Sequence, residues 1–402
     1  MDLISHLHLV PKGEIDARIA AMQKYLNKLE IDAAFLTQNV DIFYFSGTMQ
    51  TSLLYIPASG EPILYVRKSV LRAEREASVR VEEMGSLRKL PERLIQSFGK
   101  AKRIGMDLDV LPYKLAERYK NLFPDAEVMD ISMSIREIRS IKSPYELGMI
   151  QKAAIIEDKA IQHFLSIVHP GMKEIEAAAE VEKVLRQQGH IGFNRMRAYN
   201  QELLYGVIAT GSSASIPTYF DGPAGGLGLS PANPTTAGWQ ELKENEPIIL
   251  DFCTCYEGYN VDQTRIVVIG QLDRELEKAY EISMNILKWT EQAAKPGVSW
   301  ESLYLDSLKI VEDAGLSEHY MGFGKDQVRF LGHGVGLEVD ELPILAKGFS
   351  HPLKENMVIA VEPKFTFPGK GVVGIENTYV VTQGGLKSLC VTPEELLNPN
   401  KL

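Results

Sequence analysis

The last part of the chain holds five side chains whose types suit the binding of divalent metal ions. Four are carboxylates inside or at the ends of apolar, strand-like runs, and one is an imidazole: Asp251, Asp262, His333, Glu362 and Glu376. A carboxylate in such a run is costly to bury unless it is paired, hydrogen-bonded or bound to a metal. Four carboxylates and one imidazole form a hard, oxygen-rich donor set. The pattern therefore predicts a site for two divalent ions, where a water molecule is activated for hydrolysis.

The spacing of the carboxylates predicts that they meet across two hairpins. Side chains alternate between the two faces of a strand, so a carboxylate on each arm of a hairpin can face the same side. This applies to Asp251 with Asp262, and to Glu362 with Glu376. The expected turns have glycine-containing sequences, which are Glu257-Gly258 and Pro368-Gly369-Lys370-Gly371.

The second part of the chain repeats its own pattern. A helical stretch ends at Pro170-Gly171 and the next one closes at Gly189, and the same order recurs at Pro296-Gly297 and Gly315. A predicted carboxylate hairpin follows each pair of helices. Because internal repeats constrain a fold, we expect two similar halves that face each other and bring four carboxylates to one central site.

Length and local pattern predict two domains. A chain of 402 residues exceeds the size at which a single core keeps growing. Residues 1–140 alternate helical and strand-like segments, which is typical of an α/β domain. A helix is then expected to begin with Ser143 as N-cap and Pro144 at its first position. We place the boundary near residue 140, with the second domain over residues 141–402.

Composition excludes several classes of function. The net charge of -10 argues against non-specific binding of nucleic acid, which requires a basic face. No apolar run approaches the roughly 18 residues of a membrane span. The first residues lack the basic flank and apolar core of a signal peptide. Three cysteines make no disulfide framework, so a cytoplasmic protein without membrane or nucleic-acid partners is expected.

The metal-ligand motifs resemble those of the pita-bread metallopeptidases, which include aminopeptidase P, prolidase, methionine aminopeptidase and the non-peptidase creatinase. Four segments carry the resemblance: Asp251 to Arg265, Gly332-His333-Gly334-Val335-Gly336-Leu337, Val361-Glu362-Pro363 and Gly374-Ile375-Glu376-Asn377-Thr378. The segment Arg139 to Pro144 is similar to the family's entry to its catalytic domain. The resemblance implies a two-domain α/β chain. Residues 1–140 would form a creatinase/prolidase-like α/β domain, and residues 141–402 a pseudo-twofold α+β pita-bread catalytic domain.

The resemblance also implies roles for the five ligands. Asp251 would bind one ion, His333 and Glu362 the other, and Asp262 and Glu376 would bridge the two. Glu362 would in addition take the proton of the attacking water and give it to the leaving amine. Manganese is the expected metal, although cobalt, zinc or iron would satisfy the same ligands. The implied activity is hydrolysis of the peptide bond before proline in short peptides, by an Xaa-Pro dipeptidase or aminopeptidase that forms a homodimer.

The chain departs from this family at several pocket positions. Thr218 and Asp340 stand where the peptidases carry two histidines that assist catalysis, and Gly374 stands where an arginine is often found. An aspartate at position 340 would repel an oxyanion unless it is protonated or paired. Tyr219 and Arg265 contact the substrate, brace the ligands or have only a packing role.

These departures leave more than one function open. Another residue can fill each missing role in a peptidase, or the substrate is a small cyclic amide or amidine, as in creatinase or ectoine hydrolase. A third reading is a non-catalytic binding module on a peptidase fold, which the intact ligand set disfavours. The segment 220–239, rich in Gly, Pro and Ala, is predicted to form a loop or lid over the substrate pocket.

Overall fold

The computed structural model describes residues 7–203 and 205–401, and the chain folds into two compact units, residues 1–139 and 140–402. The division falls beside residue 140, where the sequence places the domain boundary. Within the described residues, no helix combines the length and the apolarity needed to cross a membrane.

The N-terminal unit is built around a mixed six-stranded sheet with the strand order β4-β3-β2-β1-β5-β6. The predicted alternation of helices and strands is confirmed, and β2 and β3 form an antiparallel hairpin. The strands are β1 (Ala33–Leu36), β2 (Ser52–Pro57), β3 (Ile63–Val66), β4 (Arg80–Glu83), β5 (Arg103–Met106) and β6 (Glu127–Asp130). The helices are α1 (Lys12–Lys28), α2 (Asn39–Ser46), α3 (Val70–Glu76), α4 (Leu90–Phe98), α5 (Tyr113–Lys120) and α6 (Ser132–Ser140).

A buried carboxyl group lies where the parallel strands β1 and β5 end. Asp107 follows β5, and its Oδ2 accepts hydrogen bonds from the backbone N–H groups of Thr37 (3.1 Å) and Gln38 (2.8 Å). Nearby Asp41 is paired with Arg139 at 2.8 Å. Burial, and then the charge of Asp41, raise the pKa of Asp107 to about 7, against the opposing effect of the backbone hydrogen bonds.

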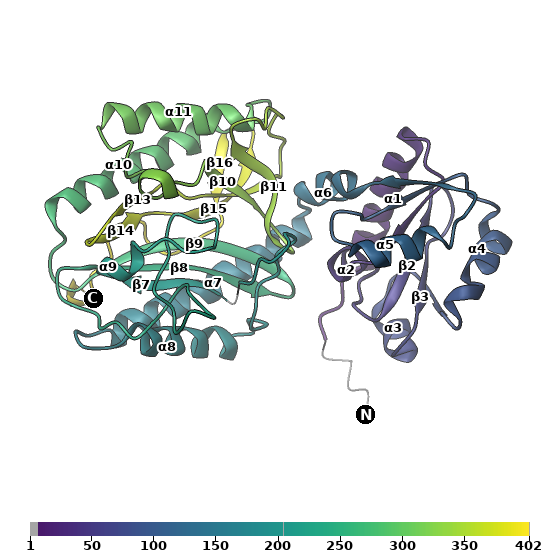
Figure 1. The fold of residues 1–402 in the computed structure, drawn as a ribbon, viewed down its shortest axis with the longest axis horizontal. Helices are drawn as coiled ribbons and strands as arrows, with labels where there is room; N and C mark the ends of the chain where they lie inside the picture. The colour runs from purple at the N-terminus through teal and green to yellow at the C-terminus, as the bar shows by residue number, and fades with distance from the viewer. Residues whose placement is uncertain (1–6, 204, 402) are drawn as a thin grey trace. The chain divides into compact units, whose positions relative to one another are not determined.

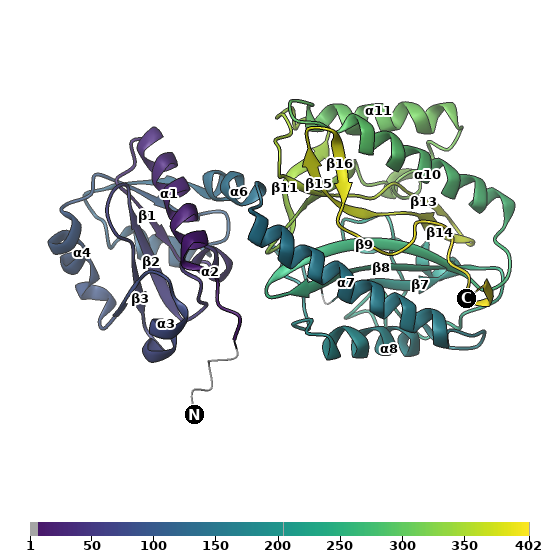
Figure 2. The ribbon, with the colours of Figure 1, turned by 180° about the vertical axis from the view of Figure 1, so that it is seen from behind.

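The C-terminal unit places its strands between two pairs of helices, as Figures 1 and 2 show. The helices are α7 (Pro144–Ile167), α8 (Glu174–Gln187), the short α9 (Gly211–Ala214), α10 (Arg274–Ala293) and α11 (Trp300–Asp313). One sheet has the order β7-β8-β9, with strands Gly206–Thr210, Pro247–Tyr256 and Tyr259–Val268. A second has the order β11-β10-β12-β15-β16, with strands Val339–Ala346, Phe330–Val335, Val358–Val361, Asn377–Thr382 and Gly385–Ser388. A two-stranded ribbon joins β13 (Lys364–Phe367) to β14 (Gly371–Gly374).

The predicted internal repeat is confirmed. The first half supplies α7, α8 and the β8–β9 hairpin, and the second supplies α10, α11 and the strands from β12 to β15. The start of α7 is also as predicted, because Ser143 caps the helix and Pro144 occupies its first turn. Ser143 and Glu146 form a reciprocal capping box: the backbone N–H of each donates to the side chain of the other.

Strand alternation directs the carboxylates toward the interior of this unit. Ile248 and Leu250 on β8 belong to an apolar cluster with α7 and α8, whereas Ile249 belongs to the cluster that includes α10 and α11. Asp251 lies two residues after Ile249 and therefore on the same face of β8, so its side chain faces the second half of the unit.

The two halves are joined by backbone hydrogen bonds at the point where the ligands converge. Thr264 of β9 and Glu376 form an antiparallel bridge, with N···O distances of 3.3 and 3.4 Å. Two residues along each strand, the hydroxyl Oγ1 of Thr378 accepts a hydrogen bond from the backbone N–H of Asp262 and donates one to the carbonyl oxygen of Asp262. These contacts hold Asp262 of the first hairpin close to Glu376 of the second.

Candidate metal centre

The first predicted carboxylate hairpin is confirmed. Strands β8 and β9 pair along their whole length and are joined at Glu257 and Gly258. In this register Cys253 faces Asp262 and Asp251 faces Thr264. Asp251 and Asp262 are therefore diagonal neighbours on the same face, rather than directly opposite each other.

The second hairpin changes sheets at its two carboxylates. Before the change β12 pairs with β15, and after it β13 pairs with β14, with Lys364 opposite Gly374. Pro363 has no N–H with which to continue the ladder. Glu362 and Glu376 consequently lie at the break between the two sheets, both of them buried. The turn falls at residues 368–370, within the predicted segment.

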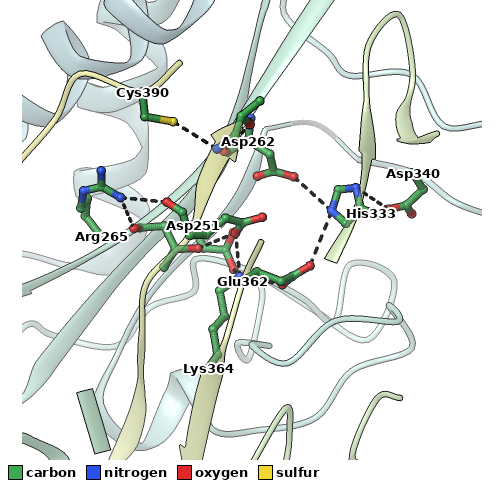
Figure 3. A network of polar contacts seen from close by, with 11 residues as sticks. Asp251, Asp262, Arg265, His333, Asp340, Glu362, Lys364 and Cys390 are labelled. Atoms are coloured by element: carbon green, nitrogen blue, oxygen red, sulfur yellow. Dashed lines mark hydrogen bonds and ion pairs between the residues drawn. The ribbon is translucent and has the colours of Figure 1, made fainter. Parts of the chain in front are cut away.

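His333 on β10 completes the cluster. Its Nε2 lies 3.5 Å from Glu362 Oε1 and 3.7 Å from Asp262 Oδ2. Its Nδ1 lies 3.1 Å from the carbonyl oxygen of Gly334 and 3.2 Å from Asp340 Oδ1, as Figure 3 shows for the aspartate. A proton on Nδ1 satisfies these acceptors and leaves the Nε2 lone pair directed at the carboxylates, which is the arrangement of a metal-binding histidine.

Three of the five predicted ligands fit one divalent ion. Asp262, His333 and Glu376 each offer one ligand atom, and these atoms all lie within 4.8 Å of one another. Within the described part of the chain, Oε1 of Glu376 has no hydrogen-bond partner although it is buried. A buried carboxylate oxygen without a donor is costly, and a cation would satisfy it.

A lysine whose role the sequence did not reveal occupies the space between three of the predicted ligands. The Nζ of Lys364 lies 2.7 Å from Glu362 Oε2, 2.7 Å from Glu376 Oε2 and 3.1 Å from Asp251 Oδ2. In Figure 3 this side chain extends toward Glu362 and Asp251, and it is 1% exposed. In this arrangement the ammonium stands where a cation shared by Asp251, Glu362 and Glu376 would stand, and the ligand atoms of Asp262, His333 and Glu376 remain available for one divalent ion. A lysine two positions after a ligand glutamate, within an apolar strand, was the available signal.

The electrostatics of the cluster reflect its burial. Burial, and then the charge of Glu376, raise the pKa of Asp262 to about 8. Burial also raises the pKa of Glu362 to about 8, although the Lys364 ammonium opposes the effect. Burial likewise opposes ionisation of Glu376, but Lys364 and His333 outweigh it and lower its pKa. For His333 burial favours the neutral ring, yet Asp340 and the ligand carboxylates raise its pKa to about 9. An ion must therefore displace protons when it binds near neutral pH.

The cluster forms the floor of a cavity with about 840 Å³ of empty space, counting the part open to solvent. Phe220 and Pro223 contribute to one wall, and Phe330 and Val339 to another. The segment 220–239 contains no helix and no extended strand, and it supplies a large share of the lining. A loop that lines the pocket is what its composition predicted.

The other pocket candidates fall in different places. Asp340 lines the cavity, with half of its side chain exposed, beside His333. Thr218 and Tyr219 do not line it, and Tyr219 is 52% exposed. Thr218 Oγ1 accepts a hydrogen bond from the backbone N–H of Phe220 at 3.2 Å, so it shapes the start of the lining loop.

Arg265 braces the ligands and does not line the cavity. It is fully buried, and its guanidinium donates to five oxygens at 2.7–2.8 Å. The acceptors are the carbonyls of Thr264, Glu376, Thr392 and Pro393 and the side chain of Asn377. Among the roles that the sequence left open for Arg265, these hydrogen bonds favour bracing of the ligands. It ties β9 to the segment that carries Glu376.

Comparison with known proteins agrees with this fold and site. Residues 148–383 match the model of metallopeptidase family M24, and residues 18–141 match that of the creatinase/prolidase N-terminal domain. Because the first match spans more than half of the chain, the protein belongs to metallopeptidase family M24. This is a family of divalent-metal-dependent hydrolases, and the chain is accordingly a metallopeptidase by class.

Individual relatives extend the likeness to the whole chain. An Xaa-Pro dipeptidase of Pyrococcus furiosus is 28% identical over 94% of this chain and 99% of its own length. The crystal structure of the prolidase from Pyrococcus horikoshii OT3 superposes with a TM-score of 0.79 at 27% identity, and covers 95% of this chain and 100% of its own. An Xaa-Pro dipeptidase from Bacillus anthracis has a TM-score of 0.80 at 24% identity, over 96% of this chain and 99% of its own, and supports the fold alone.

Proposed function

We propose that this protein hydrolyses the peptide bond before proline in short peptides. The observation that carries the proposal is the group of Asp262, His333, Glu376 and Glu362 on the floor of a cavity with apolar walls. The relatives named Xaa-Pro dipeptidase, which span nearly the whole chain, support the choice of substrate.

Asp262, His333 and Glu376 would hold one divalent ion, which supplies Lewis-acid chemistry that activates water and polarises a carbonyl. Glu362 is the residue placed to handle protons. Lys364 holds its Oε2 at 2.7 Å, which leaves Oε1 on the side of His333 to accept a proton from water and return it to the leaving amine.

The cavity walls would select the substrate and exclude water. Phe220 and Phe330 offer aromatic surface to the ring of a proline residue, which has no N–H to satisfy. Asp340, half exposed at the cavity, is placed to accept from the free amine of a short peptide. Recognition of a free amine would favour dipeptides and tripeptides over long chains.

We further propose manganese as the ion, a cytoplasmic location and a homodimer. Carboxylate-rich sites with a single imidazole suit manganese. The three free cysteines, Cys253, Cys255 and Cys390, agree with a reducing compartment. The homodimer rests on the family resemblance.

The test is an assay of purified protein with added manganese on Xaa-Pro dipeptides and tripeptides, with Xaa-Ala peptides as controls. Glu362→Gln should lower kcat at least about 100-fold, because the proton acceptor is removed. Glu355→Gln makes the same substitution at an exposed position and should leave kcat unchanged. The proposal fails if none of the proline peptides is cleaved.

A second candidate is hydrolysis of a small cyclic amide or amidine. Two observations favour it: a lysine within the carboxylate cluster, and Asp340 in place of an assisting histidine. A carboxylate at the cavity would bind a cationic amidine well. Turnover of such compounds, without cleavage of proline peptides in the same assay, would replace the first candidate by this one.

A further inference from the structure

We propose that Lys364 is a built-in cation that takes the place of one of the two metal ions, so that the centre binds a single ion per chain. The inference rests on the proposed function only in taking the acidic cluster as a metal site.

The contacts of Lys364 are those of a cation saturated by its ligands. An ammonium has three N–H donors and no acceptor. Three carboxylate oxygens, from Asp251, Glu362 and Glu376, lie within 3.1 Å of its Nζ. Each N–H group therefore has one acceptor, and the oxygens come from both hairpins, as they would for a bound metal ion.

The backbone makes room for this side chain. Lys364 opens β13 directly opposite Gly374 on β14. A Cβ atom at position 374 would lie 2.6 Å from Lys364 Cα and 2.7 Å from its Cγ, closer than real contacts allow. The carbonyl oxygen of Pro363 would lie 2.6 Å from the same Cβ, so the close approach of the two backbones requires glycine at 374. The glycine also leaves the space that the first part of the Lys364 side chain occupies.

The two carboxylate oxygens of Glu376 have different surroundings, one beside Lys364 and one beside Asp262 and His333. Oε2 accepts from Lys364 at 2.7 Å and from Thr264 Oγ1 at 2.8 Å. Oε1 has no partner in the described part of the chain and belongs to the group that Asp262 and His333 complete. A metal ion binds carboxylate oxygens at about 2.0–2.2 Å. A second ion on Asp251, Glu362 and Oε2 of Glu376 would therefore need the place that the ammonium holds.

The test counts bound manganese in the full-length protein. Wild type, Lys364→Met and Lys370→Met are dialysed against Mn²⁺, the metal content is measured, and the electron paramagnetic resonance spectrum is recorded. Methionine keeps most of the length of lysine and removes the charge. Lys370 lies on the same hairpin, is exposed, and forms ion pairs with the surface residues Asp273 and Glu275, so it is the matched control.

We expect one manganese per chain in wild type and in Lys370→Met, with the six-line signal of an isolated ion. Lys364→Met should bind two and show the broadened spectrum of an exchange-coupled pair. Two ions in wild type would overturn the inference, and so would a folded Lys364→Met that binds only one. If Lys364→Met does not fold, the count in wild type and in the control still decides the question.

The count needs no substrate, so this inference and the proposed function can fail separately. Two ions per chain together with cleavage of proline peptides would reject the built-in cation and keep the peptidase. One ion per chain without cleavage would keep the cation and reject the peptidase.

Discussion

Replacing Arg265 by methionine should destabilise the C-terminal unit strongly, although the residue touches no part of the cavity. The guanidinium donates five hydrogen bonds and is fully buried. Methionine fills much of the same volume but donates none of them. The loss of stability in this variant therefore measures the lost hydrogen bonds, and not the cost of an empty space left by a smaller side chain.

The structure sets the size of the effect. Thr264 and Glu376 keep their reciprocal backbone bridge in the variant, so their carbonyls retain a donor. The carbonyls of Thr392 and Pro393 and the side chain of Asn377 lose the donor that Arg265 gives them. A buried acceptor left unpaired costs about 1–3 kcal/mol. Thr392 and Asn377 are buried, whereas Pro393 is exposed and water can replace the donor that its carbonyl loses. Two buried acceptors give at least about 2 kcal/mol, a substantial part of the roughly 5–15 kcal/mol that stabilises a typical protein.

The assay is urea unfolding followed by tryptophan fluorescence. All three tryptophans, Trp239, Trp289 and Trp300, lie in residues 140–402, so the signal reports on the unit that contains Arg265. Arg265→Lys should recover only part of the loss, because lysine cannot reproduce the planar fork. Arg274→Met at an exposed position of α10 is the control. A loss below about 1 kcal/mol for Arg265→Met would refute the reasoning.

Three further outcomes are expected. His333→Ala should weaken manganese binding at least about 100-fold, measured by titration calorimetry, because one of three ligands is lost. Ser143→Ala should lower the free energy of unfolding by about 1 kcal/mol in urea, because the capping box of α7 is broken. Asp107 has a folded pKa of about 7 against 3.8. The folded state therefore holds this proton more tightly than the unfolded state, and its contribution to stability falls as pH rises from about 4 to about 7 and is constant above. Asp107→Asn should remove that loss, up to roughly 4 kcal/mol, and so be more stable than wild type at pH 8 but not at pH 4. Far-UV circular dichroism in urea at both pH values measures this, and an equal difference at the two values would contradict it.

Local pattern was enough to predict much of the C-terminal unit. Apolar, strand-like runs beside Asp251 and Asp262, with a glycine turn between them, predict a hairpin from local sequence alone. The recurrence of Pro-Gly at 170–171 and 296–297 defined the two halves. The N-terminal hairpin and the cap at Ser143 follow from equally local rules.

Long-range register decided what local pattern did not. Lysines are almost never fully buried, so a lysine at the start of β13 would ordinarily be assigned to the surface. Only its pairing with Gly374 and the convergence of three carboxylates from two hairpins place the Lys364 ammonium inside the cluster. In the same way, the family resemblance placed Thr218 and Tyr219 at the pocket, whereas Phe220, whose backbone N–H bonds to Thr218 Oγ1, lines the cavity instead.

The sequence by itself determined the type of site, because ligand chemistry depends on residue types and on the two-residue period of strands. It therefore identified a carboxylate and histidine centre on two facing hairpins. Only the tertiary structure showed which charged side chain shares the buried cluster with the ligands and which residue braces it. Charge balance in a buried cluster depends on every group within a few ångströms, and Lys364 and Arg265 reach theirs through contacts between strands that are far apart in the chain.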